Sequence, residues 1–183
     1  MLINGVLWGV HLKNELTYDQ DIPSDVINGP TQRLGADLSV RYQLSRMLYF
    51  DLDLNYSHGR YTELPNGQNY ILLAPTLTSV AGLTIKNKGF SGSLRYRYID
   101  DRPANNDNSV VALGYFLVDA VVKYRVKKYE FGITIENVLN VDWNEAEFDT
   151  TTRLKGEPIG GFDDLCFTPG APRLIKGSVS YFF

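Results

Sequence analysis

Apolar and polar residues alternate with a period of two along most of the chain. From Leu34 to Tyr42 every second residue is apolar or aromatic, and the residues between them are polar, charged or glycine. A helix would scatter these charges around its surface, whereas a β-strand places them all on one side. The same alternation recurs in five further segments, at 48–57, 90–98, 116–125, 129–136 and 175–183. The pattern therefore predicts amphipathic strands.

Two less regular segments, 6–18 and 72–86, complete a set of about eight strands. Most have roughly nine to thirteen residues, the length that a tilted strand needs to cross a bilayer. We therefore predict an all-β fold, an antiparallel up-and-down meander that forms a transmembrane β-barrel or part of a larger one.

The links between these strands alternate between short and long. The short links are 43–46, 86–89 and 125–128, and the long ones are 19–32, 58–71, 100–110 and 137–172. Outer-membrane barrels have this asymmetry, with short periplasmic turns and long outer loops. A soluble barrel or sandwich fits the alternation of side chains equally well, because periodicity cannot tell which face lies inside. The link lengths favour the membrane.

Composition narrows the choice of function. The chain of 183 residues has a net charge of −3, which argues against a protein that binds nucleic acid through its phosphates. No apolar run approaches the length of a transmembrane helix, but a transmembrane barrel needs none. Aromatic residues make up 13% of the chain, and Tyr and Phe favour both strands and the water–lipid boundary.

Charged residues occupy the polar side of the strands at mid-strand. In a barrel these side chains would face a wet lumen, where they could line a substrate path or pair with one another at little net benefit. The predicted lumen-facing residues are Arg41, Asp51, Asp53, Arg95, Arg97, Asp119 and Glu130.

The sequence offers little catalytic chemistry. It has a single cysteine, Cys166, and two histidines, and it contains no glycine-rich phosphate loop. His58 with Asp51 or Asp53 could imitate half of a catalytic dyad, but a histidine lining the lumen is the stronger expectation. The acidic run 142–149 could offer oxygen ligands, yet it lacks the pattern of a calcium loop. We expect no enzyme, no cofactor and no metal site.

Three stretches of the chain carry a resemblance to a known family. In chain order they are Leu94–Pro103 (LRYRYIDDRP), Phe131–Asn140 (FGITIENVLN), and Thr168–Arg173 (TPGAPR) with the final strand after it. In this order and spacing, the chain from about Leu34 to Phe183 resembles the C-terminal part of the barrel of TonB-dependent outer-membrane receptors.

Two of these motifs suggest roles. Glu136, Asn137 and Asn140 resemble the strand-end motif of the family. They could cap backbone donors freed there or simply end the strand. The final residues Val179, Tyr181 and Phe183 resemble the signal that the barrel-assembly machinery recognises, although an ordinary edge strand could also end in this way.

The resemblance implies a receptor in the outer membrane of a Gram-negative bacterium. Such receptors take up a scarce ligand, such as a ferric siderophore, cobalamin, haem or a glycan, and they depend on TonB, a plug domain and the rest of the barrel. The ligand itself does not follow from this sequence. The family's barrel has about 22 strands, so residues 1–183 are expected to be a barrel segment without plug domain or signal peptide.

Two rival functions stay open at this stage. A barrel can close with as few as eight strands, so a small standalone barrel with a structural or adhesive role is possible. The other rival is an outer-membrane enzyme, which would need a polar triad at the outer rim. The sequence shows no convincing triad.

Overall fold

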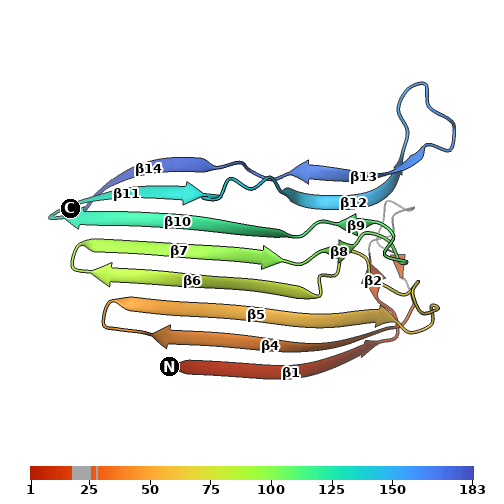
Figure 1. The fold of residues 1–183 in the computed structure, drawn as a ribbon, viewed down its shortest axis with the longest axis horizontal. Helices are drawn as coiled ribbons and strands as arrows, with labels where there is room; N and C mark the ends of the chain where they lie inside the picture. Colours follow the sequence, from red (N-terminus) through yellow and green to blue (C-terminus); the bar gives the residue numbers. More distant parts are fainter. Residues whose placement is uncertain (18–25, 28) are drawn as a thin grey trace.

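Eight long antiparallel strands form one sheet and follow each other in chain order (Figure 1). The computed structural model describes residues 1–17, 26, 27 and 29–183. The long strands are β1 (Leu2–Leu12), β4 (Thr31–Gln43), β5 (Leu48–Tyr61), β6 (Leu77–Asn87), β7 (Phe90–Ile99), β10 (Tyr115–Val126), β11 (Tyr129–Glu136) and β14 (Leu174–Tyr181). The predicted all-β meander is confirmed. In the described part of the chain no helix is long and apolar enough to span a membrane.

Tight turns and long loops lie at opposite ends of the sheet, as the link lengths predict. Three tight turns join β4 to β5, β6 to β7 and β10 to β11 at the end where both chain termini lie (Figure 1). The connections at the other end contain strands that pair outside this sheet: β2 (Leu16–Thr17), β3 (Val26–Ile27), β8 (Arg102–Pro103), β9 (Val111–Ala112), β12 (Asn144–Thr152) and β13 (Phe162–Pro169).

Several predicted boundaries need correction. The first long strand spans Leu2–Leu12 rather than 6–18. Residues 72–76 are not in a strand, because β6 begins only at Leu77, while β5 continues to Tyr61 opposite Thr31. The long link 137–172 contains the paired strands β12 and β13. The last strand ends at Tyr181 rather than at the final residue. Most of the predicted link 19–32 lies outside the described residues.

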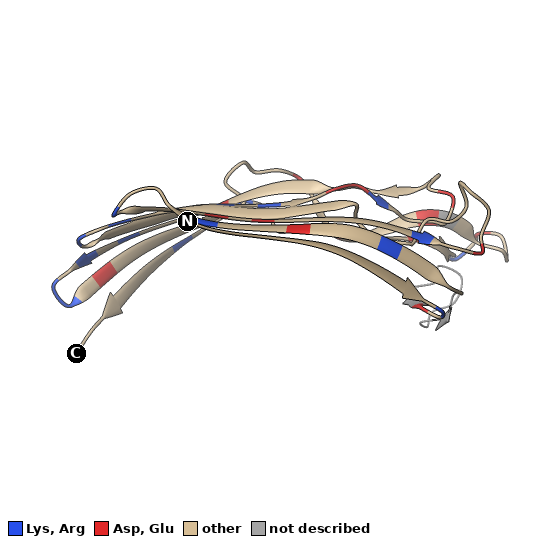
Figure 2. Cartoon of the chain, turned by 90° about the horizontal axis from the view of Figure 1, so that it is seen from below, with Lys and Arg blue, Asp and Glu red and all other residues tan. Residues whose placement is uncertain are grey.

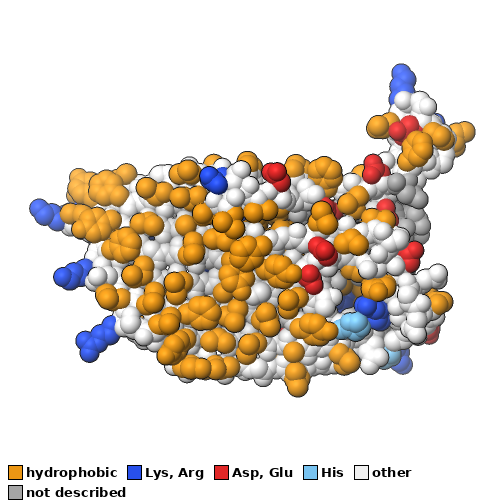
Figure 3. Space-filling model, viewed as in Figure 1, with side chains coloured by type: hydrophobic (Ala, Val, Ile, Leu, Met, Phe, Trp, Pro, Cys, Tyr) orange, Lys and Arg blue, Asp and Glu red, His pale blue; other side chains and the backbone are white. Residues whose placement is uncertain are grey.

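One face of the sheet is apolar across all eight strands. The register places Leu38 opposite Leu54, Leu83 opposite Leu94, and further residues of the same kind along every strand. Nothing in the described chain covers this face, since half or more of Leu94, Ile133 and Val179 is exposed. Figure 3 shows hydrophobic side chains spread over the whole sheet. Such a patch far exceeds what water-soluble monomers expose.

The sheet is bowed and open. Seen edge-on it forms a shallow arch (Figure 2), and the apolar face of Figure 3 lies on its convex side. Within the part of the chain that the structure describes, β1 and β14 each pair with one neighbour only, so the sheet ends in two free edges rather than closing on itself. Free edges expose unpaired backbone groups, which are costly in hydrocarbon and favour pairing with further strands.

The few fully buried side chains gather at the loop end of the sheet. Leu117 of β10 and Thr31 of β4 are almost completely inaccessible. Ile71, Ala104 and Ala112, from the loops that follow β5 and β7, are also buried. The loops therefore pack onto the sheet there.

Candidate functional site

The concave face of the sheet carries the charged side chains. Strand parity and register place all seven predicted lumen-facing residues on this face, opposite to the apolar one. They come from β4, β5, β7, β10 and β11, and they are Arg41, Asp51, Asp53, Arg95, Arg97, Asp119 and Glu130. These seven residues therefore share one surface of the sheet.

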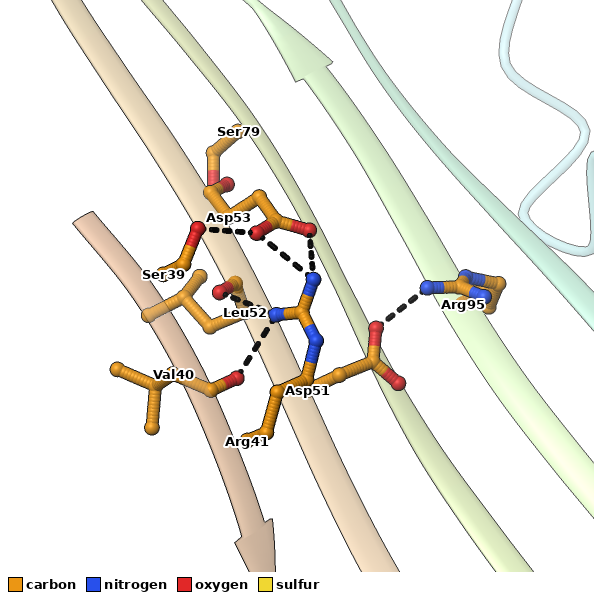
Figure 4. A network of polar contacts seen from close by, with 8 residues as sticks. All are labelled: Ser39, Val40, Arg41, Asp51, Leu52, Asp53, Ser79 and Arg95. Atoms are coloured by element: carbon orange, nitrogen blue, oxygen red, sulfur yellow. Dashed lines mark hydrogen bonds and ion pairs between the residues drawn. The ribbon is translucent and has the colours of Figure 1, made fainter. Parts of the chain in front are cut away.

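Arg41 and Asp53 form the centre of a polar network between β4 and β5 (Figure 4). The Nη2 atom of Arg41 donates to both carboxylate oxygens of Asp53, at 2.9 and 2.8 Å. Its Nη1 atom donates to the carbonyl oxygens of Val40 and Leu52, at 2.9 and 3.0 Å. The hydroxyl of Ser39 donates to Asp53 at 2.8 Å. The carboxylate and the guanidinium are therefore held in a fixed orientation.

Asp51 reaches across a whole strand to pair with Arg95. The two residues lie on β5 and β7, and Gly82 of the intervening strand β6 stands between them in the register. A Cβ atom at Gly82 would lie 2.8 Å from a carboxylate oxygen of Asp51. The glycine therefore leaves the gap through which this ion pair forms.

Three further ion pairs lie on this face. Arg97 lies 3.4 Å from Asp119, Lys123 lies 3.7 Å from Glu130, and the ammonium of Lys176 donates to Glu136 at 2.6 Å. Each predicted cation or anion thus has a partner of opposite sign. The concave face is a polar wall with little excess charge of either sign.

These ion pairs are exposed to solvent, because about a quarter to a half of each paired side chain is accessible to water. We expect Arg95→Ala to lower the free energy of unfolding by less than about 1 kcal/mol, the range of exposed pairs. Urea titration of the variant beside the unmodified protein measures this change. A loss above about 3 kcal/mol would mean that Asp51 is left uncompensated in a dry environment.

A pocket of about 420 Å³ opens at the loop end of the same face. Its floor is formed by the polar-face residues Arg33, Asn55, Ser57 and Gly59 of β4 and β5. The loops after β5 and β7 form its walls, with Tyr70, Ile71, Ala74, Pro75, Thr76, Asp101, Pro103, Asn108 and Val111. The pocket mixes cationic, amide, hydroxyl and apolar groups, as binding sites for small molecules do.

The cations around this pocket are held in place. Arg33 pairs with Glu15, which also accepts a hydrogen bond from the buried hydroxyl of Thr31. The guanidinium of Arg60 stacks on the ring of Tyr70, 4.0 Å from its centroid. The loops bring Glu15 to Arg33 and Tyr70 to Arg60. The alternation of side chains carries no information about loop folding, so these contacts could not be predicted from it.

The loop between β8 and β9 has its own anchor. Asp107 accepts hydrogen bonds from the backbone N–H of Ser109 at 3.0 Å and from its hydroxyl at 2.8 Å. These bonds hold the pKa of Asp107 below its usual value, so the carboxylate stays charged as the pH falls. The turn presents Asn108 to the pocket with a φ of 57°.

The strand-end motif of β11 forms a compact network of hydrogen bonds. Asn137 is 4% exposed and has a φ of 51°. Its carboxamide accepts from the N–H of Val141 at 2.9 Å and donates to the carbonyl oxygens of Val141 and Ala171 at 2.8 and 3.3 Å. Its own N–H donates to Asp119 at 2.9 Å. Asn140 accepts more weakly, from the N–H of Arg173 at 3.3 Å.

Trp143 connects this hydrogen-bond network to the hairpin of β12 and β13. Its indole N–H donates to Ala171 at 3.0 Å, and its ring packs edge-on against Tyr115. A Cβ atom at Gly170 would lie 2.1 Å from the indole, so only glycine fits there. The hairpin is therefore tied to the rim of the sheet.

The structure separates the groups that could have imitated catalytic or metal chemistry. His58 lies on the apolar face, whereas Asp51 and Asp53 lie on the opposite one, so no dyad forms and His58 does not line the concave wall. Part of the acidic run 142–149 is built into β12. Among the described residues, no group of three or more His, Cys, Asp or Glu side chains could hold a metal ion.

Comparison with known sequences gives one family. The model of the family described as "TonB dependent receptor-like, beta-barrel" matches residues 2–141. No curated protein sequence matches the chain.

Several solved structures have a similar fold. The ferric yersiniabactin uptake receptor FyuA from Yersinia pestis superposes with a TM-score of 0.74 at 12% identity, over 99% of this chain and 27% of its own. The siderophore receptor PiuA from Acinetobacter baumannii gives 0.72 at 13% identity, over 98% and 26%. The copper transporter OprC gives 0.68 at 18% identity, over 99% and 29%. The chain thus spans about a quarter of the length of these proteins.

Proposed function

The chain belongs to the TonB-dependent receptor β-barrel family, and on this premise we propose that it forms part of the wall of a receptor in the outer membrane of a Gram-negative bacterium. In this role the convex apolar face contacts lipid and the concave polar face contacts water. The observation that carries the proposal is the segregation of the two faces over the seven long strands from β4 to β14, with the apolar face uncovered. The edge strand β1 carries apolar residues on both faces. The open edges at β1 and β14 would pair with further strands of the barrel.

The function we propose is active uptake of a scarce ligand, of the class of ferric siderophores, cobalamin, haem or glycans. The pocket lined by Arg33, Asn55 and Tyr70 supports this role, because it lies on the lumen side at the loop end. The wall of paired charges would let a bulky polar ligand pass without binding it strongly. Energy for release would come through TonB and a plug domain seated against the polar face.

A standalone barrel is the weaker candidate. Eight strands can close into a narrow cylinder only if the sheet curls strongly, and here the arch is shallow and its edges are free. We therefore assign the sheet to a wide barrel.

The proposed orientation predicts where protease reaches the chain on intact cells. We expect cleavage within 19–32, 62–76 or 137–172, because these loops would face the medium. The turns 44–47 and 86–89 should stay intact until the outer membrane is permeabilised. Mass spectrometry of the released peptides identifies the sites. Cleavage confined to the tight turns would show that the topology is reversed.

We also propose that Val179, Tyr181 and Phe183 are read by the barrel-assembly machinery. Val179 and Tyr181 lie on the apolar face of the edge strand β14. Deleting Phe183 should reduce the amount of folded protein in the outer membrane several-fold, while Phe182→Ala, a change on the other face, should reduce it much less. Immunoblots of outer-membrane fractions measure both. Equal amounts for all three proteins would exclude this role for Phe183.

A further inference from the structure

The tight-turn end of the sheet is basic. The turns 44–47, 86–89 and 126–128 contain no acidic residue. Their basic side chains are all exposed, and they are Arg46, Lys86, Lys88, Lys127 and Lys128. In the loops at the other end, acidic residues outnumber basic ones. Figure 3 shows the basic groups extending beyond the apolar face at the tight-turn end, with acidic groups only toward the loops.

An aromatic groove opens directly beside the third of these turns. It has a volume of about 570 Å³ and is lined by Val126, Tyr129, Phe131 and Tyr181 together with the two turn lysines. The register places these four residues on the apolar face. About half of each of the three rings is exposed. An apolar groove therefore borders two cations at the level where the sheet would leave the bilayer.

The lysines hold places that other residues would fill with less strain. Lys88 and Lys127 have φ values of 50° and 53°, in the left-handed region that favours glycine and asparagine. The Nζ atom of Lys128 lies 5.9 Å from the centroid of the Tyr181 ring. Two of these turns thus carry a lysine where the backbone conformation disfavours it. The ammonium group of Lys128 lies beside an aromatic ring of the groove.

We propose that this end binds an anionic phospholipid of the phosphatidylglycerol type. The phosphodiester contacts the ammonium groups of Lys127 and Lys128, and one acyl chain lies in the groove along Phe131. Phosphate and lysine are complementary in charge, and the groove supplies the apolar contact that free phosphate could not use. The other two turns extend the attraction along the same membrane surface. This inference rests on the proposed function, since it needs the apolar face in a bilayer.

Native mass spectrometry of the full chain in detergent tests the proposal. Phosphatidylglycerol and phosphatidylcholine with the same acyl chains are added in equal amounts, and the bound lipids are counted. We expect a preference for phosphatidylglycerol that weakens with salt. The double variant Lys127→Gln/Lys128→Gln should lower it by about 25-fold, which is about fivefold for each lysine near an anionic surface. The matched control Arg153→Gln/Lys155→Gln removes the same charge at the loop end and should leave the preference unchanged.

Three outcomes would overturn the proposal. They are equal binding of both lipids, an equal loss of preference in the control, and full displacement of the lipid by inorganic phosphate. Flotation of the same proteins with vesicles of phosphatidylcholine alone reports membrane insertion separately. A chain that floats but shows no lipid preference contradicts only the lipid site, whereas a chain that never floats contradicts the proposed function as well.

Discussion

Replacing Leu94 by arginine is expected to prevent most of the chain from inserting into a membrane. Leu94 lies near the middle of β7 on the apolar face, opposite Leu83 and Ala120, and half of it is exposed. A lipid-facing arginine at the bilayer midplane costs about 2–4 kcal/mol in barrel proteins. The fraction that floats with vesicles should therefore fall by more than an order of magnitude.

The neighbouring residue supplies a matched control. Ser93 lies on the concave face, opposite Thr84 and Val121. The same arginine placed there would point into water, and we expect Ser93→Arg to insert nearly as well as the unmodified chain. If both variants fail equally, the two faces do not differ in environment, and the assignment of lipid to one of them is wrong.

Replacing Asn137 by alanine should give the second largest effect. The change removes the carboxamide that satisfies Val141 and Ala171, and it places alanine at a φ of 51°. Each lost hydrogen bond contributes about 1 kcal/mol, and left-handed backbone adds to the cost. We expect the free energy of unfolding of the rim to fall by about 2–4 kcal/mol.

Trp143 provides the readout, because its indole is tied to the same carbonyl oxygen of Ala171. Its fluorescence should report loosening at lower urea concentration in Asn137→Ala. Asn140→Ala is the control, since Asn140 also has positive φ but accepts only one bond of 3.3 Å. Equal midpoints for the two variants would mean that the buried carboxamide does not stabilise this junction.

The sequence predicted the strands and their faces because period-two alternation depends only on local backbone geometry. The alternation could not predict which charged residues pair with each other. The register sets Arg41 directly opposite Asp51, yet Arg41 binds Asp53, and Asp51 reaches over Gly82 to Arg95. Long side chains reach diagonal neighbours as easily as direct ones. Only the folded structure shows which of these neighbours is bound.

The loops were predicted least well. The alternation signal ends where the chain leaves the sheet, so neither the hairpin of β12 and β13 nor the packing of Ile71 against Gly59 could be inferred. The pocket at the rim depends on these contacts. The strand-end motif was found as a motif, but its partner Ala171 is 34 residues away in the sequence. No local pattern indicates such a contact.

A single-cysteine scan along Phe90–Ile99 of β7 tests the central claim most directly. Cys166, which is exposed and the only cysteine, is first replaced by serine. A fluorophore at each position of the membrane-inserted chain is then quenched by brominated lipid or by aqueous iodide. Strict alternation is expected. Brominated lipid should quench at Leu94 and at the other positions on the apolar face, and iodide should quench at Arg95 and at the other positions on the polar face. Quenching by iodide on both faces, or by lipid on neither, would contradict this claim.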